Sequence, residues 1–501
     1  MSPPFKASPS EFNQRLLFPT NIFDLLPADH ECYLYADLFT QLDTTAVEAQ
    51  FSVRGQHAYH PRLLISILIY AYSQGVFSSR QIQKRCSQDL AFMLIAQQQC
   101  PNFRVLSDFR KDNAEYFHAC FKQTVQLALA LKLASLGHIS LDGSKFKASS
   151  SKHKSMSYQR LKDKEAALTK EIEVLIGKAN RCDREEDRTY REQTGYEIPE
   201  DLKYKQTRLA QIEAAKKALE AREKALHPDD AIDGKKQISF ADKEARIMGK
   251  KGNFDYAYNG QISVDQDHQI IVGQHISQQA NDSQELEAAL ASLVVTTGRM
   301  PDKMSMDNGY MSGANLESLE SAGIDTYIAT DRSEKPNQLS LAESDRRLVK
   351  ADFTYNQSSD SFTCPAGQEL RVVSTTKRDR VYRGEAAVCG QCEYQRRCCQ
   401  SNKGAARTIT TDNKEAIRQR MNVKMRQAES KAVYKDRKII VEPVFGQIKN
   451  SGFRGFSVRG KVKVSGEFSL VCAVHNIKKI IKSVVMGQVR PQFGNWVMTG
   501  A

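Results

Sequence analysis

Residues 138–142 read HISLD and residues 303–307 read KMSMD, and each stretch has the character of a short strand that ends in an acid. Aspartate is disfavoured inside strands, so two strands that close on Asp142 and Asp307 favour a shared explanation. Gly143 and Ser144 follow the first aspartate and are expected to end its strand. Because the carboxyl ends of strands in an α/β sheet converge on one edge, we expect the two carboxylates to meet there.

The segments around these strands predict the order of the remaining elements. The hydrophobic period switches to two from residue 256, which predicts a β-hairpin formed by residues 258–264 and 269–276. Helices and strands then alternate over residues 283–297, 303–307, 312–322, 324–329 and 412–449. Three strands in a meander followed by this alternation is the element order of an α/β, ribonuclease H-like fold with a mixed-sheet core.

The rest of the chain is expected to surround this core. A buried helix over residues 61–74 begins at a proline, and a second helix to about Ile95 opens with a capping box at Ser78. These helices fit either a helix-turn-helix or an ordinary helical hairpin. We expect an all-α domain at 1–135, core segments at 136–150, 250–334 and 406–485, a helical-hairpin insertion at 151–249 with its linker near 182–200, a Cys-containing β-rich insertion at 335–405, and a tail at 486–501.

Composition places the chain among folded proteins. The 501 residues are 41% hydrophobic and 26% charged, which excludes wholesale disorder. No apolar run approaches the roughly 20 residues that a membrane helix needs, and the N-terminus does not resemble a signal peptide. An odd number of cysteines, 11, in such a chain indicates a reducing compartment. We therefore expect a cytoplasmic protein without a membrane partner.

The distribution of charge is more informative than its total. The chain has 72 Lys and Arg against 59 Asp and Glu, a net charge of +13. Residues 403–482 alone contain 19 basic and 6 acidic residues, whereas residues 156–226 contain 16 and 15. A solvated, lysine-rich helical face would account for a small excess. An excess of this size in one segment favours a nucleic-acid surface.

A third acid completes a candidate metal site. Two neighbouring carboxylates repel unless they share a proton or a cation, and hard oxygen ligands suit Mg²⁺ or Mn²⁺. Glu442 is a lone acid in the apolar run 441–449, where we expect it to be buried. Pro443 disfavours helical angles at Glu442, which predicts a helix start or kink there. Lys449 lies seven residues on, about two helical turns, and is expected on the same side.

These residues together resemble the DDE transposases of bacterial insertion sequences, in the group with a tyrosine-arginine-glutamate-lysine signature. The resemblance covers roughly residues 15–485 apart from the helical insertion. Each matching segment is weak alone and specific only in combination. The segments are residues 59–61 through 109–111, 141–144 (LDGS), 244–246 (EAR), 258–261 (YNGQ), 306–310 (MDNGY) and 434–449.

The resemblance implies a function and a set of site residues. Asp142, Asp307 and Glu442 would be the catalytic triad and would hold two Mg²⁺ or Mn²⁺ ions. Tyr434, Arg437, Lys449 and Arg454 would contact DNA. The signature usually has three residues between its arginine and glutamate, and here there are four, which puts the role of Arg437 in doubt more than that of Glu442.

The implied enzyme cleaves the ends of an insertion element and transfers the cut strands into target DNA. Its partners would be double-stranded DNA (the element's terminal inverted repeats and the target) and other copies of the chain, in a homodimer or larger synaptic complex associated with the nucleoid. The N-terminal helical domain would bind the element ends. Two alternatives stay open: an inactive, domesticated DNA-binding regulator, and a structure-specific nuclease of the same fold.

The second insertion holds a cysteine cluster. Cys364, Cys389, Cys392 and Cys398, with Cys399 adjacent, could ligate a structural Zn²⁺ through four thiolates, or could be free thiols in a small group of strands. In related transposases an insertion at this place helps to position DNA ends. The arginines of the insertion that suit phosphate contacts are Arg378, Arg380, Arg383, Arg396 and Arg397.

Overall fold

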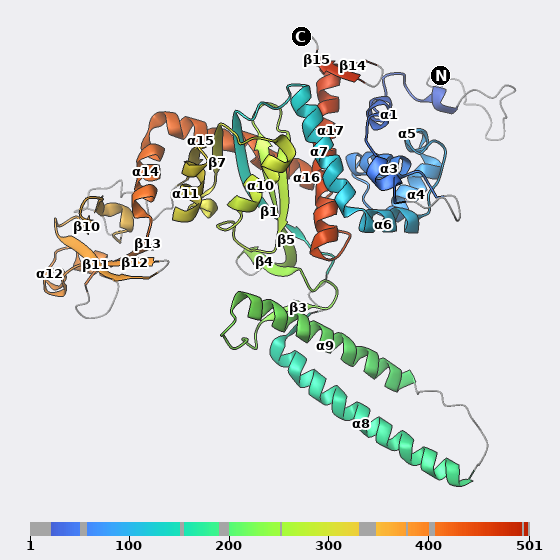
Figure 1. Cartoon of the computed structure of the whole chain (residues 1–501), viewed down its shortest axis with the longest axis horizontal. Coiled ribbons are helices and arrows are strands. Elements are labelled where there is room, and N and C mark those ends of the chain that lie inside the picture. Colours follow the sequence, from blue (N-terminus) through green and yellow to red (C-terminus); the bar gives the residue numbers. More distant parts are fainter. Residues whose placement is uncertain are drawn as a thin grey trace, which may run out of the picture. The chain divides into compact units, whose positions relative to one another are not determined.

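The computed structural model describes residues 22–50, 58–150, 155–189, 200–250, 253–329, 347–376, 379–399, 406–492 and 495–498 (Figure 1). It is mixed α/β, as the sequence predicted. The chain divides into two compact units, residues 1–109 with 483–501, and residues 110–482. Within the described ranges, no helix is both long and apolar enough to cross a membrane.

The first unit is mainly helical. A two-stranded sheet near the C-terminus joins it, and the Trp496 indole nitrogen donates a hydrogen bond to Asp37 Oδ2 at 2.7 Å. Its helix α6 continues into the second unit. The elements are η1 (Ile22–Leu25), α1 (Cys32–Thr40), α2 (Thr45–Glu48), α3 (Pro61–Ser73), α4 (Ser79–Gln88), α5 (Leu90–Ile95), α6 (Phe103–Asp112), β14 (Val489–Gln492) and β15 (Asn495–Met498).

Helix α3 confirms the predicted buried helix, and the next helix differs from its prediction. Pro61 occupies the first turn of α3, and the backbone N–H of Arg62 donates to the His60 ring at 3.2 Å. The predicted single helix to Ile95 is two helices, because Asp89 is extended and its carboxylate accepts the first free N–H groups of α5. Ser78 precedes α4 without a side-chain cap, so the predicted capping box is wrong.

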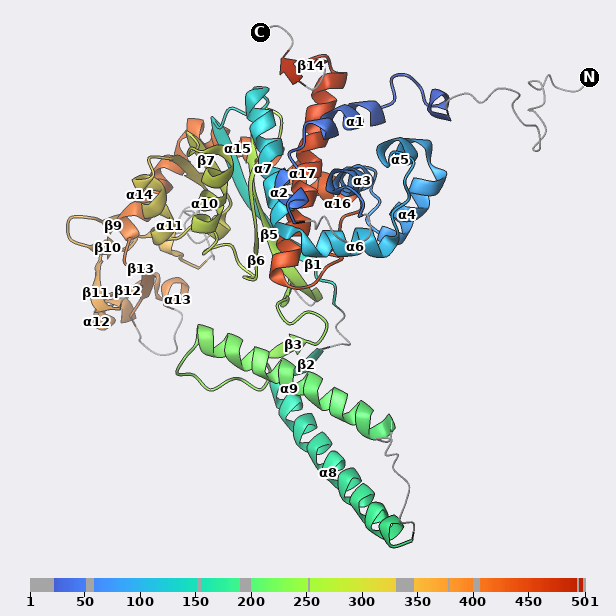
Figure 2. The same ribbon diagram turned by 45° about the vertical axis from the view of Figure 1, so that its right-hand side comes forward.

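A mixed six-stranded sheet forms the centre of the second unit (Figure 2). Strand β5 lies antiparallel to β1, β4 and β6, whereas β7 is parallel to both β1 and β8. The spatial order is β4-β5-β1-β7-β8, with β6 also paired to β5. The strands are β1 (His138–Lys147), β4 (Arg246–Lys250), β5 (Asn253–Asp265), β6 (Ile271–Ser277), β7 (Lys303–Met306) and β8 (Asp325–Ile328).

Helices pack on this sheet and carry the C-terminal basic region. Helix α10 packs on β6 and against α7, and α15 packs on β1, β7 and β8. The predicted basic helix over 412–449 is three helices in succession, α14, α15 and α16. The bounds are α7 (Ala114–Ala130), α10 (Leu286–Thr297), η3 (Asn308–Tyr310), α11 (Gly313–Ser321), α14 (Glu415–Arg426), α15 (Ala428–Ile440), α16 (Glu442–Asn450) and α17 (Lys461–Val485).

An aromatic cluster packs two of these C-terminal helices, α16 and α17, against β1. Phe146 of β1 is fully buried, and four other phenylalanine rings surround it with centroids 5.6–6.2 Å away. Phe445 comes from α16 and Phe468 from α17. Gly260 on β5 permits this approach, since a Cβ at that position would lie 2.8 Å from the Phe468 ring. The cluster therefore sets α16, and with it Glu442, against β1.

Strand β1 is longer than predicted. The break expected at Gly143 and Ser144 is absent, because both residues pair with β5, opposite Gln261 and Gly260. The long β5 supplies partners for backbone groups beyond Asp142, so the ladder continues to Lys147. Asp142 consequently lies inside its strand, which corrects the prediction of a strand end.

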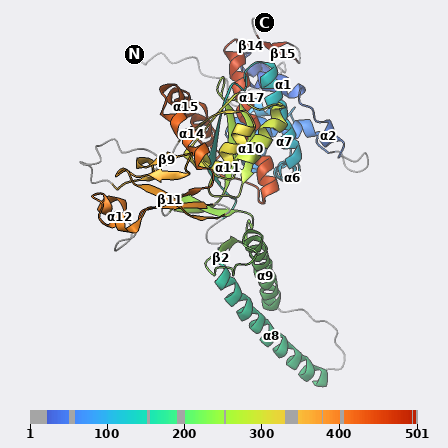
Figure 3. The same ribbon diagram turned by 60° about the vertical axis from the view of Figure 1, so that its left-hand side comes forward.

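The two insertions form two separate groups of helices and strands (Figure 3). The first is a helical pair, as predicted, with a core that includes Leu161, Ile212 and Leu219; most of its predicted linker, residues 190–199, lies outside the described residues. The second is an antiparallel sheet, β13-β12-β11-β10-β9, that packs around Phe362 and Tyr382. The bounds are β2 (Ser155–Ser157), α8 (Tyr158–Thr189), α9 (Glu200–Leu226), β3 (Gln237–Ser239), η5 (Lys350–Asp352), β9 (Thr354–Asn356), β10 (Ser361–Thr363), β11 (Glu369–Thr375), β12 (Asp379–Arg383), α12 (Ala386–Gly390), α13 (Gln395–Cys398) and β13 (Thr408–Asp412).

Candidate active site

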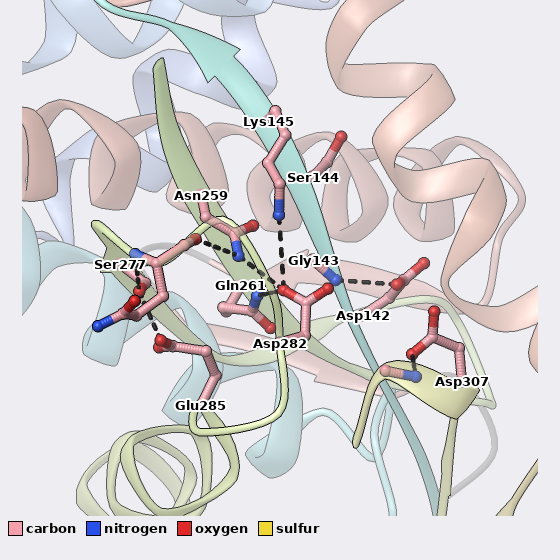
Figure 4. A network of polar contacts seen from close by, with 12 residues as sticks. Asp142, Gly143, Ser144, Lys145, Asn259, Gln261, Ser277, Asp282, Glu285 and Asp307 are labelled. Carbon is pink, nitrogen blue, oxygen red and sulfur yellow. Dashed lines mark hydrogen bonds and ion pairs between the residues drawn. The ribbon is translucent and has the colours of Figure 1, made fainter. Parts of the chain in front are cut away.

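The register of two parallel strands brings Asp142 and Asp307 together. Leu141 on β1 pairs with Met306 on β7, so the two aspartates follow at equivalent positions of adjacent strands, which lie about 4.8 Å apart in a sheet. Figure 4 shows the two carboxylates as neighbours. Asp307 comes directly after β7, as predicted, and its carboxylate accepts a hydrogen bond from the Gly309 N–H at 2.8 Å.

Glu442 is linked to Asp142 through an arginine. Helix α15 ends at Ile440 and α16 begins at Glu442 with a proline in its first turn, which confirms the predicted helix start. From α15, Arg437 Nη2 lies 2.9 Å from Asp142 Oδ2, and its Nη1 donates to Glu442 Oε1 at 3.1 Å. The guanidinium group therefore bridges two of the three predicted acids.

Glu442 is more exposed than the sequence suggested. Its side chain is 48% exposed, whereas the Arg437 side chain that it meets is 8% exposed. The expectation of a buried glutamate is thus wrong. The physical reason is its place in the first turn of α16, where the apolar neighbours Val441 and Val444 turn inward and leave Glu442 on the outer side.

Burial and the neighbouring charges shift the proton affinity of Asp142. Burial raises the pKa of this carboxyl to about 6; the Arg437 guanidinium opposes the shift, and the Asp307 carboxylate adds to it. Burial also disfavours the charged form of Arg437, but Asp142 and the other acids outweigh this effect and raise the pKa of the arginine. Asp142 and Arg437 are thus a coupled pair in which each stabilises the charge of the other.

Two further predicted residues lie beside Asp142. Lys449 Nζ donates to Ser144 Oγ at 2.5 Å and lies 5.3 Å from the centre of the Phe146 ring. Burial lowers the pKa of Lys449, and Asp142 opposes that shift. Tyr434 lies one helical turn before Arg437; burial raises the pKa of its hydroxyl, Arg437 opposes the shift, and the three acids reinforce it.

Arg454 lies apart from this group. It is exposed in the segment after α16, and its carbonyl oxygen accepts a hydrogen bond from the Lys147 N–H at 3.3 Å. Lys147 is the last residue of β1, five positions beyond Asp142. The structure therefore places Arg454 beside the far end of the strand that carries Asp142 and not among the acids.

Asp282 is a fourth acid of the site, and the sequence analysis missed it. Its Oδ1 accepts hydrogen bonds from Asn259 Nδ2 and Gln261 Nε2, both at 2.6 Å, and lies 3.7 Å from Lys145 Nζ (Figure 4). Its charge contributes to the raised pKa of Asp142, after burial and the nearer charges. Asp282 sits in a polar segment between β6 and α10, where nothing in the local sequence distinguishes it from other loop residues.

The same network holds the turn that carries Asp307. The Tyr310 hydroxyl, buried at the end of η3, donates to the Gln261 side-chain oxygen, while the Gln261 nitrogen binds Asp282. Gly143 leaves room for this arrangement, since a Cβ there would lie 2.2 Å from Gln261 Nε2 and 2.7 Å from Asp282 Oδ1. A chain of hydrogen bonds thus connects β5 to the turn after β7.

The carboxylates suit a hard divalent cation by their chemistry. Across the described residues, however, no three His, Cys, Asp or Glu side chains are already arranged to hold a metal ion. Arg437 is bound to both Asp142 and Glu442 in this arrangement. A metal ion shared by these two acids would replace the guanidinium group as their cationic partner.

The five cysteines of the second insertion line one cavity of about 390 Å³. The Gln368 N–H donates to Cys364 Sγ at 3.3 Å, and burial raises the pKa of the Cys398 thiol to about 12, with Arg407 opposing the shift. No three of the described cysteines are positioned as metal ligands, so zinc stays a prediction. Of the arginines predicted to contact phosphate, Arg380 pairs with Asp360, and Arg378 lies outside the described residues.

Two parts of the chain match family models. Residues 363–481 match the transposase DDE domain, and residues 20–112 match a transposase domain (DUF772). The first match contains Arg437, Glu442 and Lys449, whereas Asp142 and Asp307 lie outside both. None of the curated proteins compared with the chain matches it. The chain therefore resembles insertion-sequence DDE transposases, whose DDE domains generally use divalent metal ions.

Proposed function

We propose that this protein is a DNA transposase that cleaves DNA at the ends of an insertion element and joins the cut strands to target DNA. The observation that carries the proposal is the juxtaposition of acids that lie 135 or more residues apart in the sequence: Asp142 and Asp307 follow paired residues of adjacent parallel strands, and Glu442 shares one guanidinium group with Asp142. The match of residues 363–481 to a transposase DDE domain supports the same reading.

The strand order supports a ribonuclease H-like core for this enzyme. The central part of the sheet runs β6-β5-β1-β7-β8, with β5 antiparallel to β1 and with β1, β7 and β8 parallel. This is the meander followed by alternating helices and strands that the sequence predicted. In the proposal Asp142 and Asp307 stand at adjacent positions because the fold pairs β1 with β7.

The triad would hold two Mg²⁺ or Mn²⁺ ions, which in phosphoryl transfer activate the attacking oxygen and stabilise the leaving one. The protein's own groups would position the DNA and balance charge. Asp142, with a pKa of about 6, is ionised at neutral pH and above. Tyr434 keeps its proton as a hydrogen-bond donor, because its pKa is raised. Lys449, fixed on Ser144, supplies a cation beside Asp142.

The proposed partners follow from the reaction. Double-stranded DNA is the substrate, as terminal inverted repeats and as target. Joining two element ends to one target requires both ends in one assembly, so we expect a homodimer or a larger synaptic complex on the nucleoid. The excess positive charge of residues 403–482, which include Glu442, suits this polyanionic substrate.

The test is a cleavage and strand-transfer assay with the full chain, Mg²⁺ or Mn²⁺, and duplex DNA that carries the sequences flanking its reading frame. We expect Asp142→Asn, Asp307→Asn and Glu442→Gln each to lower the cleavage rate by at least ~10²-fold, because each removes a charge needed in the transition state. Glu429→Gln, which removes an exposed acid of α15, is the matched control and should cleave as the wild type does.

Three results would each contradict part of the proposal. Wild-type cleavage by the Asp142→Asn and Asp307→Asn variants would remove the triad assignment. Cleavage without joining at any element end would instead identify a nuclease, and DNA binding without cleavage would identify a regulator.

A further inference from the structure

A basic cavity lies at the base of the helical pair α8 and α9. It has a volume of about 930 Å³, and each charged residue in its described lining is a cation. The cations come from four separate segments: Arg160 from α8, Arg208 from α9, Lys243 from the segment between β3 and β4, and Arg459 from the segment before α17. Segments up to 299 positions apart in the sequence therefore converge on one concave, positive site.

Two of these cations, Arg208 and Arg459, are held in place by neutral partners. The Arg208 guanidinium lies 4.8 Å from the centre of the Phe240 ring and donates to Gln211 Oε1 at 3.2 Å. Arg459 Nε donates to the Ser149 carbonyl oxygen at 3.1 Å. Within the described part of the chain, none of the four forms an ion pair with a carboxylate. The positive charge of the cavity is therefore not neutralised by carboxylates within the described residues.

Other cations of the same helical pair behave differently. Lys216 pairs with Glu165 at 2.6 Å, and Lys205 pairs with Glu171 at 2.9 Å. The helical insertion as a whole is close to neutral, with 16 basic and 15 acidic residues over 156–226. The cavity differs from its surroundings in gathering four cations from separate segments without a carboxylate in its described lining, so an anionic ligand would supply the missing counter-charge.

We propose that this cavity binds the phosphate backbone of double-stranded DNA, as a second contact of the DNA that enters the acid site. The inference rests on the proposed function for the identity of its ligand. Arginine guanidinium groups present forked donors that match phosphate oxygens, and an open cavity with several such groups suits a continuous backbone. The helical insertion then serves to extend the DNA-binding surface.

The path of β1 bounds the distance from Asp142 to Ser149, which contacts the edge of the cavity. Ser149, the partner of Arg459, lies seven residues beyond Asp142, and Ala148 still pairs with β5 through a 2.8 Å hydrogen bond to Tyr256. At about 3.3 Å per residue this extended segment spans at most roughly 23 Å. Phosphates of one DNA strand advance about 3.4 Å per nucleotide along the helix axis. The edge of the cavity at Arg459 would therefore contact phosphates about seven nucleotides from the cleaved bond.

Binding of a fluorescent duplex to the full chain tests the proposal, measured by anisotropy in EDTA over a range of salt concentrations. We expect the Arg160→Gln/Arg208→Gln variant to bind more weakly and to lower the slope of log K against log salt by about 0.9 for each phosphate that it no longer neutralises. The matched control is Lys203→Gln/Lys217→Gln, which removes two exposed charges of α9 outside the cavity lining and should keep the wild-type slope. Arg208→Lys, which keeps the charge, should retain most of the affinity.

Hydroxyl-radical footprinting of the same complexes gives a second readout. We expect wild-type protection about seven nucleotides from the cleavage site, absent in the cavity variant and kept in the control. Equal salt slopes for the cavity and control variants, or an unchanged footprint, would overturn the inference while leaving the proposed function intact. Normal cleavage by Asp142→Asn together with weaker binding by the cavity variant would overturn the triad assignment alone.

Discussion

At the scale of single residues, the acid site is organised by charge. Arg437 is nearly buried and bound to two carboxylates, whose charges offset part of the cost of burying the guanidinium group. The raised pKa of Asp142 shows that the folded chain holds this charge against the cost of burial. Asp282 adds a fourth carboxylate, which two side-chain amides bind.

The Asp142→Asn variant should gain stability over the wild type as pH rises. The folded pKa of about 6 exceeds the ordinary value of 3.8, so the folded protein binds this proton more tightly than the unfolded chain does. The wild type therefore loses stability as pH increases between these values, and the variant does not. A pKa difference of about two units corresponds to a difference of at most about 3 kcal/mol between the unfolding free energies of the variant and the wild type at alkaline pH. Near pH 4 and below we expect no such difference.

Urea denaturation in EDTA measures this difference in the free energy of unfolding at several pH values. The exposed Asp229→Asn is the control and should show no such trend. A stability difference between Asp142→Asn and wild type that does not change with pH would contradict the assigned burial of the charge.

Asp282→Ala should slow cleavage without weakening DNA binding. The substitution removes the acceptor of the Asn259 and Gln261 amides and frees Gln261, which holds Tyr310 beside Asp307. We expect a kcat about 10–100-fold lower at unchanged KM, since misplacement of a catalytic group by about 1 Å has costs of this size. Asp282→Asn keeps an acceptor oxygen and should recover much of the rate. A rise in KM as large as the fall in kcat would argue against a positioning role.

At the scale of elements, close packing determines where the site residues lie. Strand β1 extends past Asp142 because β5 offers it a full-length partner, and α16 begins at Glu442 because Pro443 fits the first turn of a helix. Helices α7 and α17 approach closely at Gly466, where a Cβ would lie 2.6 Å from Ala114 Cα. The second unit therefore depends on small residues at a few close approaches.

Gly466→Ala should destabilise the protein, because the added methyl group meets the backbone of α7. Overpacking of this kind costs about 1–3 kcal/mol. Gly446→Ala, in α16, is the matched control: its Cβ meets nothing within 4 Å, so the variant should gain up to about 1 kcal/mol from improved helix propensity. Thermal denaturation of the two variants measures both effects, and equal melting temperatures would contradict the close α7–α17 packing.

At the scale of the whole molecule, the insertions are additions to a central sheet. The helical pair has its own apolar core and joins the remainder through β2 and β3, which pair with each other. Its two ends are consequently adjacent in space: Ser155 lies opposite Ser239. An insertion of this kind can be removed without breaking the sheet that carries Asp142 and Asp307.

Deletion of residues 156–238, with an Asn-Gly turn joining Ser155 to Ser239, should leave a folded protein. The two serines are cross-strand partners, and Asn-Gly suits a two-residue hairpin turn. We expect one cooperative unfolding transition for the second unit, and a DNA-binding salt slope reduced by about 0.9 for each phosphate that Arg160 and Arg208 would neutralise. Circular dichroism checks the first result and anisotropy the second; an unfolded product would show that the insertion is required for the fold.

Local sequence patterns were sufficient for much of this protein. The period of apolar residues predicted the helical pair and the β5–β6 hairpin, and Pro443 predicted the helix start at Glu442. These features depend on propensities and spacings within a few residues. The sequence also predicted that Asp142 and Asp307 lie close together, but the reason is the parallel register of β1 and β7 and not a shared strand end, since Asp142 lies inside β1.

Only the tertiary structure decided how the site is assembled. The bridging of Asp142 and Glu442 by Arg437, the place of Asp282 and the extension of β1 past Gly143 all depend on contacts between distant segments. The same is true of the basic cavity, whose four cations come from separate elements. Sequence determined the elements because their energetics are local. Charge pairs and cavities form between segments that are distant in the sequence. Packing across the whole unit determines which of these segments meet.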